Sequence, residues 1–247
     1  METQRTQPVH FALAVLFYNE EENVLGVVSG LKEALDAEKA DYQLVLVNNG
    51  STDRTPSLIR ELTSHDPRLK AVTVETNLGY GWGAIQGLNT AAGEWIGFMA
   101  GDGQVEPHDV ARLYRETRHG YDLVKVRRAY RQDGFVRGVI SDVYMMTFCL
   151  LFDLPFYDIN ATPRVFRREW LEKLDLQSRD WFLDAEIMIK ARNLGLSIKE
   201  VTIVFRRRKG GKSNVRLATV FEFVLNILKY RLGRGLSQWK KKIGLKS

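Results

Sequence analysis

A single cysteine, Cys149, is all the thiol that this 247-residue chain contains. One thiol cannot form an intrachain disulfide, and it cannot supply a cysteine-rich zinc site. So little cysteine suits a reducing compartment. We therefore expect a cytosolic protein whose fold depends on a buried apolar core.

Long hydrophobic runs are missing as well. A helix that crosses a bilayer needs about 20 apolar residues. The longest candidate, residues 143–156, is interrupted by Asp153 and Pro155. The first five residues also lack the apolar core of a signal peptide. The sequence thus favours a cytoplasmic protein, which could rest on a membrane without crossing it.

Positive charge is modestly in excess. The 36 lysine and arginine residues outnumber the 30 aspartate and glutamate residues, and the net charge of +6 suggests an anionic partner. That partner could be a phosphate ligand, a membrane surface or nucleic acid. We expect no nucleic acid, because no recognition module is visible and the basic residues are not interleaved with a stacking platform. The length fits one large domain, or one domain with an appendage.

Apolar runs alternate with amphipathic segments in the first half of the chain. The runs are continuous, which predicts buried strands over residues 11–17, 44–47, 69–74 and 95–99. The segments between them predict helices over residues 21–38, 54–63 and 80–92. This alternation indicates an α/β fold with a mostly parallel, twisted sheet flanked by helices. In such sheets ligands bind beyond the carboxyl ends of the strands.

The second half is less regular. Helices are predicted over residues 107–119, 134–151 and 184–193, and strands over residues 123–126 and 197–205. Residues 206–216 form a basic loop with two glycines, which favours a mobile loop that closes on phosphate. An amphipathic helix over residues 217–232 and a lysine-rich tail follow. Both could lie on an anionic membrane, or the helix could pack on the core.

Polar side chains follow the first two predicted strands. Tyr18 and Glu20 could meet a base or ribose, or they could simply begin a helix. Asn49 can donate and accept hydrogen bonds, and the turn at residues 50–52 opens a helix whose free N–H groups attract phosphate. Asp53 could belong to that site or only cap the helix.

Gly79 begins a Gly-x-Gly-x-Gly run that superficially suggests a dinucleotide-binding fingerprint. The spacing is wrong, and the run follows the third strand rather than the first. We expect these glycines either to admit a ligand close to the backbone or to pack the next helix on the sheet.

Asp102 and Gln104 follow the fourth predicted strand. On an extended backbone, side chains two residues apart project to the same side. Carboxylate and amide oxygens suit Mg²⁺ or Mn²⁺, which need few protein ligands when phosphates complete the shell. The alternative is a solvated turn before Glu106 and Pro107.

Basic residues and two further carboxylates complete the set of candidate site residues. A charge run is usually a solvated face, although arginine forks suit oxyanions. The basic candidates are Arg127, Arg128, Arg131, Arg137, Arg206, Arg207, Arg208 and Lys212. Asp184 and Glu186 open a predicted helix. Either could act as a base or orient an acceptor, or both could only favour the helix N-terminus.

Taken in order, these segments resemble the family 2 glycosyltransferases of the GT-A fold, most closely the dolichyl- and polyprenyl-phosphate sugar synthases. The motifs are Tyr18-Asn19-Glu20, Asn-Asn-Gly-Ser-Thr-Asp at 48–53, Asn77-x-Gly79, Asp102-x-Gln104, Arg128-x-x-Arg131-x-Asp133, Arg137-x-x-x-Ser141, Asp158 and Arg208-x-x-Gly211-x-Ser213-Asn214. The resemblance covers roughly residues 11–216. It implies a glycosyltransferase domain over residues 1–216, followed by an amphipathic helix and basic tail over residues 217–247.

The resemblance also implies roles for the matching residues. Base and ribose would contact Tyr18, Glu20 and Asn49. The metal, Mg²⁺ or Mn²⁺, would be held on the diphosphate by Asp102 and Gln104. Phosphates of donor or acceptor would be gripped by Arg137, Ser141 and Arg208. The implied nucleotide-binding set is completed by Asp53, Gly79, Lys212 and Ser213.

Three departures from the family pattern matter. Residues 16 and 17 are Leu and Phe where a proline is usual. Asn48 and Asn49 replace two aspartates, which removes negative charge near the nucleotide. Ala100 replaces the first aspartate of Asp-x-Asp-x-Gln, so one metal ligand is missing. We expect lower metal affinity, or replacement of that ligand by water or Glu106.

The implied reaction moves a sugar, with inversion, from a nucleotide-diphosphate sugar to a polyprenyl phosphate. That acceptor is anionic at neutral pH and needs no general base, so Arg137 and Arg208 would chiefly hold two anionic groups together. A sugar or small-molecule hydroxyl as acceptor would need a base, for which Asp184 and Glu186 are candidates. Ala100 prompts a third alternative, a nucleotide-sugar-binding protein without turnover.

Overall fold

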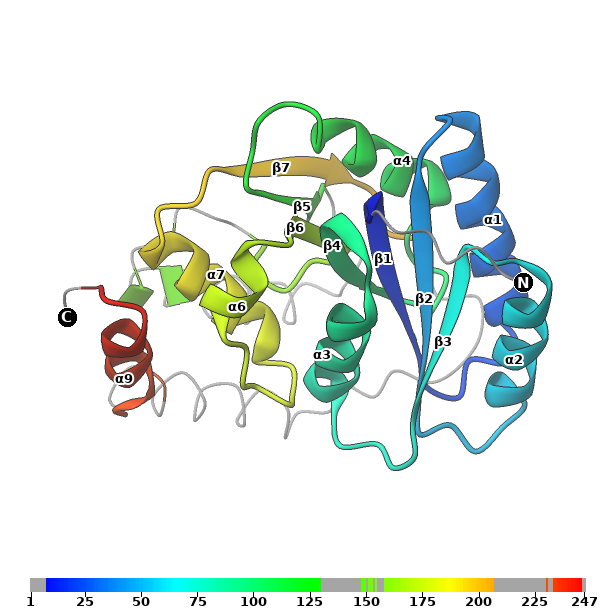
Figure 1. Ribbon diagram of the computed structural model, residues 1–247, viewed down its shortest axis with the longest axis horizontal. Helices are drawn as coiled ribbons and strands as arrows, with labels where there is room; N and C mark the ends of the chain where they lie inside the picture. Colours follow the sequence, from blue (N-terminus) through cyan, green and yellow to red (C-terminus); the bar gives the residue numbers. More distant parts are fainter. Residues whose placement is uncertain are drawn as a thin grey trace.

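The computed structural model describes residues 8–129, 148, 149, 151, 152, 154, 158–206, 230 and 233–245. In this part of the chain, strands form one seven-stranded sheet in the order β3-β2-β1-β4-β6-β5-β7 (Figure 1). The strands are β1 (Val9–Phe17), β2 (Tyr42–Asn49), β3 (Leu69–Val74), β4 (Gly93–Ala100), β5 (Leu123–Arg128), β6 (Arg164–Arg167) and β7 (Ile198–Ile203). β6 runs antiparallel to β4 and β5, and the other pairs are parallel.

Helices cover both faces of this sheet (Figure 1). One face packs against α1 (Val24–Ala37), α2 (Thr55–His65) and α4 (Pro107–Glu116). The other face packs against α3 (Tyr80–Thr90), α6 (Trp170–Leu174) and α7 (Leu183–Asn193). Near the end of the chain, α9 (Gly235–Lys242) lies beside α6. The predicted α/β class, with a mostly parallel sheet between helices, is confirmed.

The first strand shows why its sequence is apolar at every position. Ala12 and Ala14 face the α3 side of the sheet, whereas Leu13 and Val15 face the α1 side. All four side chains are fully buried. A strand that is covered on both faces has no polar face, so it reads as a continuous apolar run.

Three short elements were not predicted. β6 has only four residues and an arginine at each end, so it offers almost no periodic pattern. α6 has five residues, and α9 lies in the segment interpreted as a lysine-rich tail. Of the predicted helix over residues 217–232 the structure describes only Tyr230, which is helical and packs against Phe152 and Phe182. The domain boundary after residue 216 lies outside the described residues. No helix among the described residues is long and apolar enough to cross a bilayer.

Candidate active site

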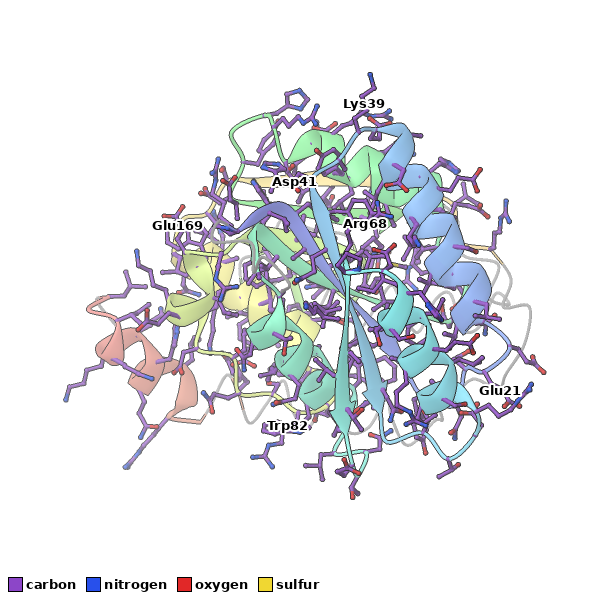
Figure 2. The ribbon with its side chains drawn as sticks, turned by 45° about the vertical axis from the view of Figure 1, so that its right-hand side comes forward. Glu21, Lys39, Asp41, Arg68, Trp82 and Glu169 are labelled. Carbon is purple, nitrogen blue, oxygen red and sulfur yellow. The ribbon has the colours of Figure 1, made fainter. Side chains whose placement is uncertain are left out.

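The strands that carry the predicted site residues end at the same edge of the sheet. Phe17 pairs with Asn48, and Leu16 pairs with Ala100. Tyr18, Asn49 and Asp102 therefore leave neighbouring strand ends, as the loop motifs predict. Figure 2 shows this edge marked by Glu21 and Trp82, at the opposite end of the molecule from Lys39 and Asp41.

The loops after β1 and β2 are held together by hydrogen bonds. The backbone N–H of Thr52 donates to the side-chain oxygen of Asn19 at 2.8 Å, and that of Glu21 donates to Asp53 Oδ2 at 3.1 Å. Asp53 Oδ1 also accepts from the N–H of Thr55 at 2.9 Å, at the start of α2. Burial opposes the charged form of Asp53, but these hydrogen bonds outweigh it and lower its pKa. Asp53 thus ties the loop after β1 to the start of α2, and its contact with a nucleotide stays a prediction.

Tyr18 and Glu20 differ in exposure. The Tyr18 side chain is exposed, so its ring is open to a ligand. Glu20 is buried, and its carboxylate accepts a hydrogen bond from Asn23 Nδ2 at 2.5 Å. The backbone N–H of Glu20 donates to Thr55 Oγ1 at 3.0 Å. Glu20 therefore helps to build the loop, whether or not it also meets a ribose.

Asn49 is the last residue of β2 and is only 5% exposed. Its Nδ2 donates to the carbonyl of Gly79 at 3.1 Å, and this carbonyl fixes the orientation of the amide because it can only accept. Its Oδ1 is buried and has no hydrogen-bond partner among the described residues. A Cβ at Gly83 would lie 2.8 Å from Asn49 Cγ, so glycine is needed there. Asn49 Oδ1 is therefore an unsatisfied acceptor that the surrounding chain covers.

Asp102 lies in a turn rather than in the extended backbone that the spacing suggested. Its Oδ1 accepts the N–H of Gln104 at 3.1 Å, and Gly103 between them has a φ of 71°, which glycine adopts readily. Asp102 is 9% exposed. The turn places the side chains of Asp102 and Gln104 beyond β4, although the backbone here is not an extended strand with side chains on alternate sides.

The root of the basic loop is attached to this turn. The N–H of Arg206 donates to the carbonyl of Gln104 at 2.9 Å, and Gln104 Nε2 donates to the carbonyl of Arg206 at 3.3 Å. Glu106 forms an ion pair with the Arg206 side chain. Glu106 therefore has a cationic partner, which works against its expected role as a substitute metal ligand.

The residues present fit a metal that the substrate helps to hold. Among the described residues, no group of three histidine, cysteine, aspartate or glutamate side chains could hold an ion by itself. The Asp102 carboxylate and the Gln104 amide oxygen leave one turn together. Mg²⁺ commonly binds through one or two carboxylates plus substrate phosphates. The turn has the oxygen ligands for such a site, with one fewer carboxylate than the family pattern.

Asp184 lies in the first turn of α7 and is 2% exposed. The Arg164 guanidinium lies 3.0 Å from its Oδ1 and donates to its backbone carbonyl at 2.8 Å. Burial raises the pKa of Asp184 to about 6, and the charge of Arg164 limits that rise. The predicted candidate base is thus a buried carboxyl group that is paired with Arg164 and has a raised pKa.

Glu186, the alternative base, is part of the framework. Its carboxylate accepts backbone N–H groups from Gln177 at 3.2 Å and Ser178 at 2.8 Å. Lys190 Nζ lies 2.6 Å from the same carboxylate, and both side chains are almost fully buried. Glu186 therefore fixes the segment that leads into α7.

Sequence reasoning missed three residues near this edge. Arg164 belongs to β6, which has no usable sequence pattern. Tyr80 and Trp181 stack on each other, with ring centroids 4.3 Å apart. Tyr80 lies in a run that was interpreted only through its glycines, and two aromatic residues a hundred positions apart give no sequence signal of contact.

Several predicted residues cannot be placed, because they lie outside the described residues. They are Arg131, Arg137, Ser141, Arg207, Arg208, Lys212 and Ser213. Their roles stay predictions.

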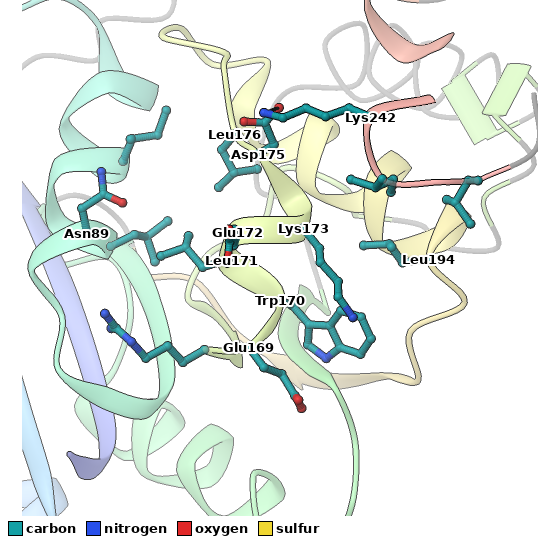
Figure 3. Close-up of a pocket in the computed structure, with 15 residues that line it drawn as sticks. Asn89, Glu169, Trp170, Leu171, Glu172, Lys173, Asp175, Leu176, Leu194 and Lys242 are labelled. Carbon is teal, nitrogen blue, oxygen red and sulfur yellow. Dashed lines mark ion pairs between the residues drawn. The ribbon is translucent and has the colours of Figure 1, made fainter. Parts of the chain in front are cut away.

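A surface cavity of about 1300 Å³ lies elsewhere, between α3, α6 and the end of the described chain (Figure 3). Leu171 and Leu176 line it, and Lys242 pairs with Asp175 at its edge at 3.0 Å. None of the predicted site residues lines this cavity.

Comparisons with known proteins identify the family and the fold. The sequence model of glycosyl transferase family 2 matches residues 13–175. The chain is 25% identical over 219 residues to an undecaprenyl-phosphate 4-deoxy-4-formamido-L-arabinose transferase of Photorhabdus laumondii, over 88% of this chain and 66% of that one. It is 31% identical over 124 residues to YkcC, an uncharacterized glycosyltransferase of Bacillus subtilis, over 50% of this chain and 38% of that one.

The fold is similar to that of glucosyl-3-phosphoglycerate synthase from Mycobacterium tuberculosis, solved with Mn²⁺, UDP and glucosyl-3-phosphoglycerate. The TM-score is 0.71, with 19% identity, over 91% of this chain and 80% of that one. At this identity the likeness concerns the fold alone. The chain spans 66% of the length of the Photorhabdus relative. The family model covers well over half of this chain, and the chain belongs to glycosyl transferase family 2.

Proposed function

We propose that this chain is an inverting glycosyltransferase that moves a sugar from a nucleotide-diphosphate sugar to a polyprenyl phosphate. The observation that carries the proposal is the convergence of Tyr18, Asn49 and Asp102 at neighbouring strand ends of a family 2 chain. The match to an undecaprenyl-phosphate sugar transferase over 88% of this chain supports a lipid phosphate as the acceptor.

The donor would bind along the carboxyl edge of the sheet. The base would pack beside the exposed Tyr18 ring, next to the end of β2 at Asn49. Asp102 and Gln104 would hold Mg²⁺ or Mn²⁺, which supplies charge neutralisation on the departing diphosphate. The similar mycobacterial synthase was solved with Mn²⁺ and UDP together, which supports this pairing of metal and nucleotide.

The acceptor needs little help from a base. A phosphate oxygen is already a nucleophile at neutral pH, so the protein mainly has to bring two anionic groups together. Arg137 and Arg208 are the residues we assign to that task. Peripheral contact with a membrane is part of the proposal, because the acceptor is a lipid. Of the helix over residues 217–232 that would make the contact, the structure describes only Tyr230.

Two measurements test this function. A thermal-shift panel of UDP-glucose, GDP-mannose and their nucleoside diphosphates, with and without Mn²⁺, identifies the donor. Radiolabelled sugar from that donor is then offered to undecaprenyl phosphate in detergent micelles. We expect transfer that Asp102→Ala abolishes, whereas Asp41→Ala at the opposite edge leaves it unchanged. Transfer only to soluble hydroxyl acceptors would refute the lipid part. Donor binding without turnover, across metals and acceptors, would identify a binding protein instead.

One observation favours a hydroxyl acceptor as the second candidate. A pKa of about 6 at Asp184 is close to the value that suits a general base at neutral pH. This candidate predicts that Asp184→Asn removes turnover with hydroxyl acceptors while the donor still binds. Full activity of Asp184→Asn with undecaprenyl phosphate would exclude it.

A further inference from the structure

Two segments far apart in the sequence form one wall of the site edge. The N–H of Trp82 donates to the carbonyl of Arg179 at 3.0 Å. Gly79 and Gly81 make this approach possible, because a Cβ at either position would overlap backbone carbonyl groups of the segment before α7. The wall is therefore built by close backbone contact.

An aromatic pair stands on this wall, and we call Tyr80 and Trp181 the aromatic shelf. The two rings are nearly parallel, with 14° between their planes and 4.3 Å between centroids. Tyr80 also meets the edge of Phe98 in β4, at 6.1 Å and 68°. β4 leads directly to the turn at Asp102. The shelf is thus braced against the strand that carries the candidate metal ligand.

Trp181 is the outer member of the shelf. It is 37% exposed, whereas the other four tryptophans, all in the described part of the chain, are buried or half-buried. One face of its indole is covered by Tyr80. A large aromatic ring that is held in one orientation and still open to solvent is arranged for contact with a ligand.

Polar residues lie close in sequence to the shelf or bond to its neighbours. Asp184 follows Trp181 by three residues, in the first turn of α7. Asn49 donates to Gly79, the residue before Tyr80. Burial raises the pKa of the Tyr80 hydroxyl, and the charge of Asp184 adds to that rise while the charge of Arg164 opposes it.

A sugar ring has this same pair of properties. One face presents C–H groups, which pack on an aromatic plane, and the rim presents hydroxyls, which donate to carboxylates. We propose that Trp181 binds the transferred sugar of the donor by stacking, with Tyr80 holding the indole in position. The inference rests on the proposed function and adds the subsite for the sugar. The donor therefore binds with its nucleotide toward Asn49 and its sugar toward Trp181.

Calorimetry separates the sugar from the nucleotide. The probes are UDP with UDP-glucose and GDP with GDP-mannose, in the presence of Mn²⁺. In Trp181→Ala the affinity for the preferred nucleotide sugar falls by about threefold to tenfold, the range of one aromatic contact. The affinity for its nucleoside diphosphate is unchanged. Trp181→Phe retains most of the sugar affinity because a ring remains on Tyr80. Trp82→Ala, a tryptophan of the same wall outside the shelf, leaves the ratio of the two affinities unchanged.

Fluorescence gives an independent readout. The emission of Trp181 is obtained by subtracting the fluorescence of Trp181→Phe from that of the wild-type chain. We expect this emission to respond to the nucleotide sugar but not to the nucleoside diphosphate. The inference is overturned if Trp181→Ala loses affinity equally for the nucleotide sugar and the nucleoside diphosphate, or loses no affinity for either. The proposed function would still stand. A response to phosphatidylglycerol vesicles in place of the nucleotide sugar also overturns it, since Trp181 would then be a lipid contact. Failure of the wild-type chain to bind any of the four probes refutes the proposed function itself.

Discussion

Asp184 and Arg164 form a buried pair whose balance depends on pH. Both side chains are almost fully buried, and the charge of the carboxylate is compensated mainly by one guanidinium. A buried carboxyl group is more easily protonated than an exposed one, and the arginine only partly opposes this effect. The pair therefore joins β6 to α7, although burial disfavours the charged form of Asp184.

The pKa of Asp184 predicts a stability profile. Because the pKa of Asp184 is higher in the folded state than in the unfolded state, its protonation stabilises the fold. This stabilisation is complete below pH 3.8 and is lost as the pH rises through about 6. A shift of this size corresponds to about 3 kcal/mol. We expect the unfolding free energy of the wild-type chain, relative to Asp184→Asn, to fall by about 2–3 kcal/mol between pH 4 and pH 7.5. Urea denaturation at several pH values measures it. A constant difference would show that Asp184 keeps an ordinary pKa.

Asn49 is not interchangeable with the aspartate that the family usually has there. In Asn49→Asp the hydrogen bond from Nδ2 to Gly79 is lost, and a buried carboxylate faces a carbonyl oxygen. We expect a loss of about 1–3 kcal/mol at pH 7.5 in chemical denaturation. The loss shrinks at low pH, where the protonated carboxyl group can donate to Gly79. Asn49→Ala is the control, since its loss does not depend on pH; equal profiles for the two variants would contradict this account.

Among the elements, α1 contains two glycines in different surroundings. A Cβ at Gly26 would meet nothing within 4 Å, whereas a Cβ at Gly30 would lie 2.8 Å from Pro107 Cγ at the start of α4. Glycine disfavours a helix because its backbone loses more freedom on folding.

These two glycines predict opposite results from one substitution. Gly26→Ala raises the unfolding free energy by about 0.5–1 kcal/mol, the helix-propensity gain. Gly30→Ala gains no stability, because α1 and α4 must move apart to admit the methyl group. Thermal unfolding of both variants measures the difference. Equal gains would mean that the two helices are less closely packed than described.

The elements that could be predicted are those with a repeating pattern. β1, β2 and β4 are continuous apolar runs because both faces are covered, and α1 carries one buried stripe. Parallel strands then dictate that Tyr18, Asn49 and Asp102 share an edge. β6 could not be predicted, since its buried Arg164 looks like a surface residue until Asp184 is placed beside it. The aromatic shelf depends on that same long-range packing.

At the scale of the whole molecule, α9 packs on α6 and α7, chiefly through Trp239. Trp239 is buried, and its Nε1 donates to the carbonyl of Lys173 at 2.9 Å. Lys190 lies over its ring at 5.3 Å. The end of α9 then forms part of the cavity wall (Figure 3).

The burial of Trp239 makes the docking of α9 easy to test. Trp239→Ala removes a large buried ring, with an expected loss of up to about 3–5 kcal/mol in the docking of the helix. Trypsin should therefore cleave faster at Lys240–Lys242, as followed by mass spectrometry under native conditions. Gln238→Ala, at an exposed position of the same helix, is the control. Equal cleavage rates for the two variants would show that α9 is held by other contacts.

The antiparallel strand β6 has a consequence for synthesis on the ribosome. β3, β2, β1 and β4 are consecutive neighbours in the sheet, and all lie within residues 9–100. Their outer partner begins only at Arg164. The residues from 101 to 163 must be translated in between, which takes roughly 3–13 seconds at about 5–20 residues per second. During that interval β4 presents a bare row of N–H and C=O groups, so the nascent half-sheet is most vulnerable to mispairing at this strand.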